Sequence, residues 1–233
     1  MLKQFLLLLA AMVGCAGCAM NQSDELGPTP LPQAHAHNDY LHSHPLKTAL
    51  ANGFCSVEAD VFAVDGKLLV AHDRDKVTSR RTLDRLYLEP LRSESARHGG
   101  RVYHDGPSIT LLIDFKNDWH AILPLLRRML RRYEDLLTMY DDQGRHEGAV
   151  TVILSGHRPP AEVLALEKVR YAAIDGTQSD IDRDDPPDLI PWISLEWKKV
   201  LTWRGDGVMP ADQQAKLKKL VDRVHAKGRK LCL

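Results

Sequence analysis

Two carboxylates on one predicted strand are the residues of this chain best placed to do chemistry. Side chains alternate between the faces of a strand, so Glu58 and Asp60 share one face and Val57 and Val61 share the other. The apolar face is typical of a buried one. Two carboxylates pointing the other way repel each other unless a positive charge lies between them. The stretch therefore predicts a cation-binding site.

A tight turn then brings a histidine back towards the same edge. Asp65-Gly66 is a typical turn sequence, and the apolar run Leu68–Val70 and His72 follow it. Histidine exchanges protons near neutral pH and can act as a general acid or base. The alternative is a half-exposed strand with solvated acids, but the apolar flanks favour a site.

A third carboxylate lies on a separate strand-like run, Ile109–Phe115, where Asp114 and Lys116 share a face. If this strand neighbours the first, Asp114 joins Glu58 and Asp60. Three oxygen ligands without a cysteine suit Mg²⁺ or Ca²⁺ better than a softer metal. The alternative is an ion pair between Asp114 and Lys116 at a strand end.

Two further histidines end the first strand-like run, Gln33–His37. His35 and His37 face the same way, so alternation does not choose between them. A histidine here and His72, on opposite sides of a phosphodiester, could act as general base and general acid. A metal ion would neutralise the phosphate and lower the pKa of an attacking hydroxyl, from the substrate or from water.

Strands and helices alternate beyond the N-terminal segment. Strands are expected at Gln33–His37, Phe54–Phe62, Ile109–Phe115, Ala149–Leu154, Arg170–Ile174, Leu189–Leu195 and Lys230–Leu233. Helices are expected at Pro45–Asn52, Thr82–Arg97, Trp119–Met139, Pro160–Val169 and Ala211–Ala226. This α/β alternation predicts a parallel sheet. Polar residues at nearly every strand end favour a TIM-type (β/α) barrel over an open sheet, for which no glycine-rich phosphate loop is present.

The domain organisation follows from these segments. A TIM-type barrel has eight strands, whereas the chain stops at Leu233 inside the seventh strand counted. We therefore expect residues 33–233 to form a barrel truncated before its eighth strand. Residues 1–18 are expected to be a signal peptide and residues 19–32 a flexible tether.

Composition excludes one class of partner. The 233 residues carry 31 basic and 31 acidic side chains, so bulk charge does not draw the protein to nucleic acid. A hydrophobic content of 44% is ordinary for a folded domain with a core. We expect a monomer in which Cys55 and Cys232 form no disulfide.

The N-terminus has the layout of a targeting signal. Lys3 precedes the short apolar run Phe5–Val13, and small residues follow. The ending resembles a bacterial lipoprotein signal, with Cys18 and Cys15 as lipidation candidates; an ordinary cleaved signal peptide is the alternative. Either way we expect an exported bacterial protein, periplasmic or anchored to a membrane by its lipid.

Several motifs together resemble a known superfamily. In order, they are His37-Asn38-Asp39, Pro45-Leu46-x-x-Ala49-Leu50-x-x-Gly53, Glu58-x-Asp60-Val61, Asp65-Gly66-x-Leu68 and His72-Asp73. Their order and spacing resemble the phospholipase C (PLC)-like phosphodiesterases, which include the glycerophosphodiester phosphodiesterases and phosphatidylinositol phospholipases C. The closest likeness is to the altered inheritance of mitochondria branch. The match is dense from His35 to Lys116 and loose afterwards.

The resemblance implies a metal-dependent hydrolase of glycerophosphodiesters or phospholipid headgroups that uses one Mg²⁺ or Ca²⁺ ion. The implied roles are acid–base catalysis by His37 and His72, metal binding by Glu58, Asp60, Asp114 and Asn38, and phosphate binding by Lys116. There are two departures. The usual His-Arg-Gly is replaced by His37-Asn38-Asp39. Asp114 stands where many relatives carry Glu, although the sphingomyelinase D-like branch resembles this chain in carrying Asp there.

Two other functions remain open. His35-x-His37 also resembles the amidohydrolases and the polymerase-and-histidinol-phosphatase (PHP)-like metal hydrolases, which hold zinc or manganese and need further histidines, of which His157 could be one. Alternatively, the chain is a catalytically inactive exported barrel that binds a ligand without turnover.

Overall fold

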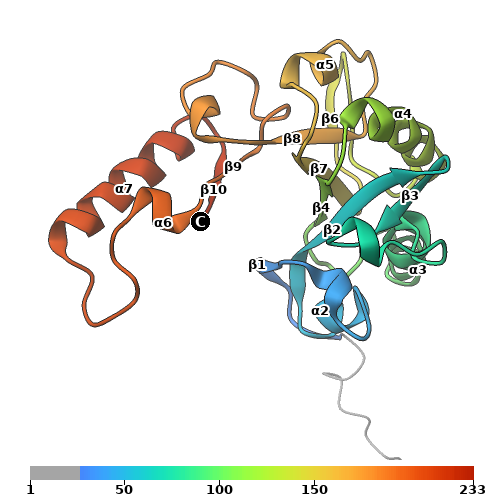
Figure 1. The fold of residues 1–233 in the computed structure, drawn as a ribbon, viewed down its shortest axis with the longest axis horizontal. Coiled ribbons are helices and arrows are strands. Elements are labelled where there is room, and N and C mark those ends of the chain that lie inside the picture. Colours follow the sequence, from blue (N-terminus) through green and yellow to red (C-terminus); the bar gives the residue numbers. More distant parts are fainter. Residues whose placement is uncertain (1–26) are drawn as a thin grey trace, which may run out of the picture.

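The computed structural model describes residues 27–233 and is built around one curled parallel sheet (Figure 1). Its parallel strands are β1 (Leu31–Ala36), β2 (Phe54–Val64), β4 (Ile109–Phe115), β7 (Val150–Gly156), β8 (Ala172–Gly176), β9 (Trp192–Ser194) and β10 (Lys230–Cys232). They lie in the order β1-β2-β4-β7-β8-β9-β10, and β3 (Lys67–Val70) pairs antiparallel with β2 after the Asp65-Gly66 turn. The predicted α/β parallel sheet is confirmed.

Within the described residues, the seven parallel strands form a curled half-barrel whose edges are β1 and β10 (Figure 1). The closed TIM-type barrel stays a prediction. The half-barrel curves far enough for the His35 ring of β1 to lie edge-on, 6.2 Å from the Trp192 ring of β9. β1 starts at Leu31, inside the segment expected to be a tether, because Leu31 pairs with Phe54.

Helices connect most of the strands. They are α2 (Lys47–Ala51), α3 (Glu89–Arg97), α4 (Trp119–Leu130), α5 (Ala161–Ala165), α6 (Trp197–Val200) and α7 (Ala211–His225). A π-helix, Asp84–Leu88, leads into α3. None of the helices in residues 27–233 has the length and apolar character needed to cross a membrane.

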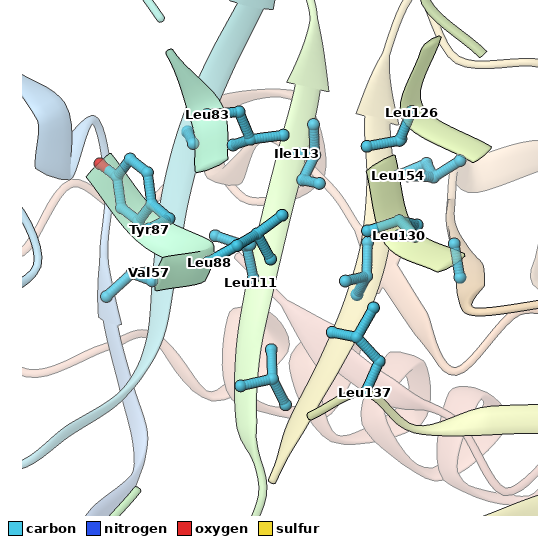
Figure 2. Close-up of a cluster of buried hydrophobic side chains, with 14 of the residues drawn as sticks. Val57, Leu83, Tyr87, Leu88, Leu111, Ile113, Leu126, Leu130, Leu137 and Leu154 are labelled. Carbon is cyan, nitrogen blue, oxygen red and sulfur yellow. The ribbon is translucent and has the colours of Figure 1, made fainter. Parts of the chain in front are cut away.

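The main core lies on the outer face of the sheet. Figure 2 shows side chains of β2, β4 and β7 packed against the π-helix and α4. The labelled residues are Val57, Leu83, Tyr87, Leu88, Leu111, Ile113, Leu126, Leu130, Leu137 and Leu154. Because alternate residues of a strand face opposite ways, this packing turns Glu58, Asp60 and Asp114 towards the inner face.

One predicted helix, Trp119–Met139, is wrong in its second half. The helix starts as expected, with the Asp118 carboxylate accepting a hydrogen bond from the His120 backbone N–H at 3.0 Å. It ends at Leu130 because the following apolar residues pair with the sheet: the Thr138 N–H donates to the Val150 carbonyl at 2.7 Å. The chain then forms a hairpin of β5 (Met139–Asp141) and β6 (Gly144–His146).

Among residues 27–233, Cys55 and Cys232 form no disulfide with each other; Cys55 is buried and Cys232 is partly buried. The expected signal peptide and its candidate lipidation sites, Cys15 and Cys18, lie outside the residues that the structure describes.

Candidate active site at the strand ends

Three carboxylates meet where β2 and β4 end. Asp60 and Asp114 are direct partners in the parallel register of these strands, and Glu58 precedes Asp60 on the same face. One oxygen from each of the three carboxylates lies within 4.8 Å of the others. Asp60 is fully buried and Glu58 is 5% exposed. The conditional prediction that these strands are neighbours is confirmed.

Lys116 lies among these acids. Its Nζ is 2.8 Å from Asp60 Oδ2 and 3.2 Å from Asp114 Oδ1, so the ion pair considered as an alternative is present. Burial acts to lower the pKa of Lys116, but the hydrogen bond and charge of the two aspartates raise it overall. Burial raises the pKa of Asp114, and repulsion from Asp60 adds to this against the attraction of Lys116.

The acid cluster fits a divalent cation. Asp60 Oδ1 is buried and accepts no hydrogen bond from any group in residues 27–233, and such an oxygen is costly unless something binds it. The ammonium of Lys116 alone cannot balance three carboxylates. All three donors are hard oxygens, which are the ligands that Mg²⁺ and Ca²⁺ prefer. The donor set of Glu58, Asp60 and Asp114 is therefore suited to one of these two ions.

Two imidazoles are each tied to a different buried acid. His37 Nδ1 lies 3.0 Å from Glu58 Oε2, and His72 Nδ1 lies 3.0 Å from Asp60 Oδ2. The contact of His72 is a hydrogen bond, and because a carboxylate only accepts, His72 Nδ1 carries the proton and its Nε2 is left free. The contact of His37 is a close approach of Nδ1 to the Glu58 carboxylate. The two side chains are 73% and 49% exposed, so both rings are open to a ligand.

His35 has a different environment from His37, which alternation alone could not reveal. Its Nδ1 is hydrogen-bonded to Ser56 Oγ at 2.7 Å, and its Nε2 lies 3.5 Å from Glu58 Oε2. Ligand atoms of His35, His37 and Glu58 also lie within 4.8 Å of one another. Burial acts to raise the pKa of Glu58, but the hydrogen bond from His35 and the charge of His37 lower it overall.

Tyr40 is the site residue that sequence reasoning missed. Its buried hydroxyl lies 2.6 Å from Asp60 Oδ2, 2.8 Å from Asn38 Oδ1 and 3.1 Å from His72 Nδ1. Burial and the hydrogen bond to Asp60 raise the pKa of Tyr40, so the phenol stays protonated. Its place directly after His37-Asn38-Asp39 was the available signal, but an aromatic residue there is equally typical of core.

Asn38 and Asp39, the two residues after His37, make different hydrogen bonds. The Asn38 backbone N–H donates to Glu58 Oε2 at 3.3 Å, and Asn38 adopts the left-handed region at φ 51°. Asp39 is fully buried and accepts from the Leu46 N–H at 2.6 Å and the Tyr87 hydroxyl at 2.9 Å. Asp39 therefore holds the loop that carries His37 and Tyr40. Metal binding by Asn38 stays a prediction.

Gly156 is required beside the acids. It has φ 66°, and a Cβ there would lie 2.3 Å from Asp114 Oδ1, so a larger residue would displace that carboxylate. His157, the further histidine expected of an amidohydrolase-like site, is exposed, and its backbone N–H donates to the Phe115 carbonyl. Neither of the metal-binding groups found among the described residues includes His157.

The sequence matches a described family over this region. Residues 26–175 match the AIM6-like phosphodiesterase domain. The altered inheritance of mitochondria protein 6 homolog of Arthroderma benhamiae is 33% identical over 177 residues, which cover 66% of this chain and 56% of that protein. Altered inheritance of mitochondria protein 6 of Eremothecium gossypii is 34% identical over 62% of this chain and 42% of its own length.

The same protein of Saccharomyces cerevisiae strain YJM789 is 36% identical over 56% of this chain and 38% of its own length. The chain thus spans about half the length, or less, of these curated relatives. No solved structure matches the chain.

These relatives correct one expectation. The prediction of an exported bacterial protein, periplasmic or lipid-anchored, is wrong, because the relatives are fungal and point to a eukaryotic protein. A short apolar run before small residues and a cysteine consists of common residue types, so it does not by itself identify a bacterial lipoprotein signal.

Proposed function

The chain belongs to the AIM6-like phosphodiesterase domain family, and we propose from this that it is a metal-dependent phosphodiester hydrolase of the wider PLC-like superfamily. Its substrates are glycerophosphodiesters or phospholipid headgroups. One divalent cation, Mg²⁺ or Ca²⁺, is its cofactor, and its half-barrel is part of a TIM-type barrel.

The pair of tethered imidazoles carries this proposal. His72 is hydrogen-bonded through Nδ1 to Asp60, and His37 Nδ1 lies 3.0 Å from Glu58 Oε2, which leaves Nε2 of each ring for proton transfer. One imidazole takes the proton of the attacking hydroxyl, from water or the substrate. The other donates a proton to the oxygen that leaves phosphorus. A new P–O bond forms as the old one breaks, and the two imidazoles exchange protonation states.

The acids and the lysine complete the proposed site. Glu58, Asp60 and Asp114 would hold the cation, with Asn38 as a further ligand. The cation would neutralise phosphate charge and lower the pKa of the attacking hydroxyl. The ammonium of Lys116, 24% exposed beside Asp60 and Asp114, is placed to contact a phosphate oxygen. Tyr40 orients His72 and Asp60 relative to each other.

One observation favours a second candidate. The cluster of His35, His37 and Glu58 offers two nitrogen ligands and one oxygen ligand, a set that suits zinc or manganese. A metal hydrolase of the amidohydrolase or PHP-like type would use it. Metal analysis of the purified protein separates the two functions, because the main proposal requires Mg²⁺ or Ca²⁺ and not zinc or manganese.

The test is hydrolysis of a glycerophosphodiester with added Mg²⁺ or Ca²⁺ and with EDTA. We expect activity that EDTA abolishes and that His37→Ala and Glu58→Gln each remove. His42→Ala, which changes an exposed histidine in the neighbouring loop, is the matched control and should retain activity. Activity that survives EDTA or either site substitution contradicts the proposal, and a folded chain without any turnover would support a binding protein instead.

A further inference from the structure

A polar pocket of about 620 Å³ opens beside the acid cluster, at the ends of β7, β8 and β9. Nothing in the proposed chemistry uses it. Most of its lining residues are polar and include both charge signs and four hydroxyls. Those at its centre and rim include Ser155, Arg158, Asp175, Thr177, Ser179 and Ser194. We call this the acceptor pocket.

Asp175 is the central group of the acceptor pocket. It is 5% exposed, and its two oxygens accept hydrogen bonds from Ser155 Oγ at 3.0 Å and Ser194 Oγ at 2.7 Å. Within residues 27–233 no cationic side chain forms an ion pair with it. The nearby Arg158 donates instead to the Asp175 backbone carbonyl at 2.7 Å and to Asp180 at 3.4 Å. Burial raises the pKa of Asp175, despite the two serine hydrogen bonds.

Asp175, Ser155 and Ser194 together present hydrogen-bond acceptors to the acceptor pocket. A hydroxyl has one proton and two lone pairs. Ser155 and Ser194 use their protons on Asp175, so their remaining lone pairs are available to a ligand. The carboxylate also keeps acceptor capacity, because each of its oxygens can accept more than one hydrogen bond. A ligand group that donates hydrogen bonds is therefore best suited to bind Asp175, Ser155 and Ser194.

The acceptor pocket adjoins the acid cluster. Ser155 pairs directly with Asp114 in the parallel register of β7 and β4. Neighbouring strands lie about 4.8 Å apart, so the pocket begins one strand spacing from the acids. Gly156 lines the pocket and packs against the Asp114 carboxylate. A diester whose phosphate lies at the acids can therefore extend its alcohol portion into the pocket.

The lining also disfavours one class of alcohol. Among the residues that the structure describes, no aromatic residue lines the acceptor pocket. A quaternary ammonium has no hydrogen-bond donor and is bound in proteins mainly by the faces of aromatic rings. Choline therefore has no aromatic ring to bind in this pocket, and it has no donor for the serine and aspartate acceptors. Hydroxyl and primary ammonium groups do find acceptors.

We propose that the acceptor pocket selects phosphodiesters whose alcohol portion carries hydrogen-bond donors, either hydroxyls or a primary ammonium, over those that carry choline. Asp175, Ser155 and Ser194 are the residues that select. The inference rests on the proposed function for its substrate class, and it adds which headgroups are preferred.

The test compares kcat/KM of the full chain for glycerophosphoethanolamine, glycerophosphoglycerol and glycerophosphocholine, with the divalent cation present. We expect at least one of the two donor-bearing substrates to exceed the choline substrate by tenfold or more. The ethanolamine and glycerol substrates separate an ammonium from a hydroxyl as the donor. Turnover of the choline substrate that matches or exceeds both others overturns the proposal and leaves the proposed function intact.

Substitutions assign the preference to the pocket. Ser194→Ala removes a half-buried hydroxyl, and Asp175→Asn replaces an acceptor by a partial donor of the same shape. We expect each to lower kcat/KM for the preferred substrate about tenfold and to leave the choline substrate unchanged. Ser93→Ala, which removes an exposed hydroxyl on α3 outside the acceptor pocket, is the matched control and should leave kcat/KM for every substrate unchanged. A preference that persists in a folded Ser194→Ala protein contradicts the assignment.

A binding measurement keeps the two proposals separate. If no diester is hydrolysed, the proposed function fails, and the pocket is tested by calorimetric titration with O-phosphoethanolamine, glycerol 3-phosphate and phosphocholine. Tighter binding of a donor-bearing phosphoalcohol, weakened by Ser194→Ala, supports the pocket without turnover. Equal binding of all three, or tighter binding of phosphocholine, overturns it.

Discussion

The two sides of the curled sheet carry different polar groups on the same inner face. At the ends of β2 and β4, three carboxylates lie together; two of them pair with Lys116, and two lie 3.0 Å from an imidazole nitrogen. At the ends of β8 and β9, one carboxylate is capped by two serine hydroxyls. The first arrangement concentrates acids and imidazoles, whereas in the second the hydroxyls of two serines bond one buried carboxylate. We propose that equivalent strand-end positions serve the reaction on one side and recognition of the alcohol portion on the other.

The two sides are also stabilised differently. The outer face of β2 and β4 is fully buried apolar surface, including Val57, Leu111 and Ile113 (Figure 2). By contrast, Leu231 on the edge strand β10 is only partly buried. The segment before β10 is held by Arg229, which is 2% exposed and donates to backbone carbonyls of the loop between β8 and β9. Apolar packing holds the acids in place, whereas at the far edge the buried hydrogen bonds of Arg229 add to the apolar packing.

The largest expected effect on activity comes from removing the His72 imidazole on the acid-cluster side of the sheet. His72→Ala removes a proposed acid–base group whose side chain is half exposed, so the fold should remain while kcat falls roughly 10²–10⁴-fold. Steady-state hydrolysis assays on folded protein measure this loss. Ser194→Ala, on the other side of the sheet, should cost only about tenfold. Equal losses of activity from the two substitutions would contradict the assignment of reaction to one side and recognition to the other.

A second prediction concerns the packing that holds the acids. Leu111→Ala on β4 leaves a cavity in the fully buried core and should lower the free energy of unfolding by about 2–5 kcal/mol. Leu231→Ala makes the same chemical change on the partly buried β10 and should cost less. Urea unfolding of both variants measures the difference. A larger loss from Leu231→Ala would show that the edge strand matters more to stability than its burial indicates.

The third prediction tests the polar contacts of the far edge. Arg229→Met removes the guanidinium that donates to the carbonyls of Asp180, Arg183 and Asp185 and leaves them without these donors. Hydrogen bonds from charged groups stabilise strongly, so we expect a loss of about 3 kcal/mol. Hydrogen exchange should quicken in β9 and β10 and stay slow in β4.

The control for this prediction is Arg223→Met, which changes an exposed arginine that pairs with Asp182 at the surface. It should leave both the free energy of unfolding and the exchange rates unchanged, because exposed ion pairs contribute little. If exchange quickened equally in β4 and β10 of Arg229→Met, the two sides would unfold as one unit.

Residue patterns predicted the sheet and much of the acid cluster because both depend on local rules. Strand alternation placed Glu58 and Asp60 on one face, and the apolar partners of that strand form the core. Asp114 needed only the further condition that its strand be the neighbour of β2, which the register meets. The choice between His35 and His37 could not be made locally, since both face the same way and differ only in tertiary surroundings.

What the sequence could not indicate depends on contacts between distant segments. Leu137 continues an apolar helical spacing, yet it pairs with Val150 of a strand, and tertiary pairing overrides the periodicity. Ser194 bonds to Asp175 across a loop that no spacing rule predicts. Tyr40 is ordinary core by type, and only the fold brings its hydroxyl to Asp60 and His72.

The smallest expected effect within the reaction side comes from Tyr40→Phe. The substitution keeps the ring and removes only the hydroxyl that orients Asp60 and His72, so kcat should fall about 10–100-fold, as for groups that orient metal ligands. KM should change little, because the buried hydroxyl does not reach the substrate. Steady-state kinetics separate these two effects.

Tyr103→Phe is the matched control, because that buried hydroxyl donates to the Leu50 and Phe54 carbonyls at 3.1 and 2.8 Å and touches none of the acids. Both substitutions should lower the free energy of unfolding by about 1 kcal/mol, the usual contribution of one hydrogen bond. Only Tyr40→Phe should lower kcat. Equal kinetic losses would mean that Tyr40 acts through stability alone, and the buried acids would then hold the imidazoles without it.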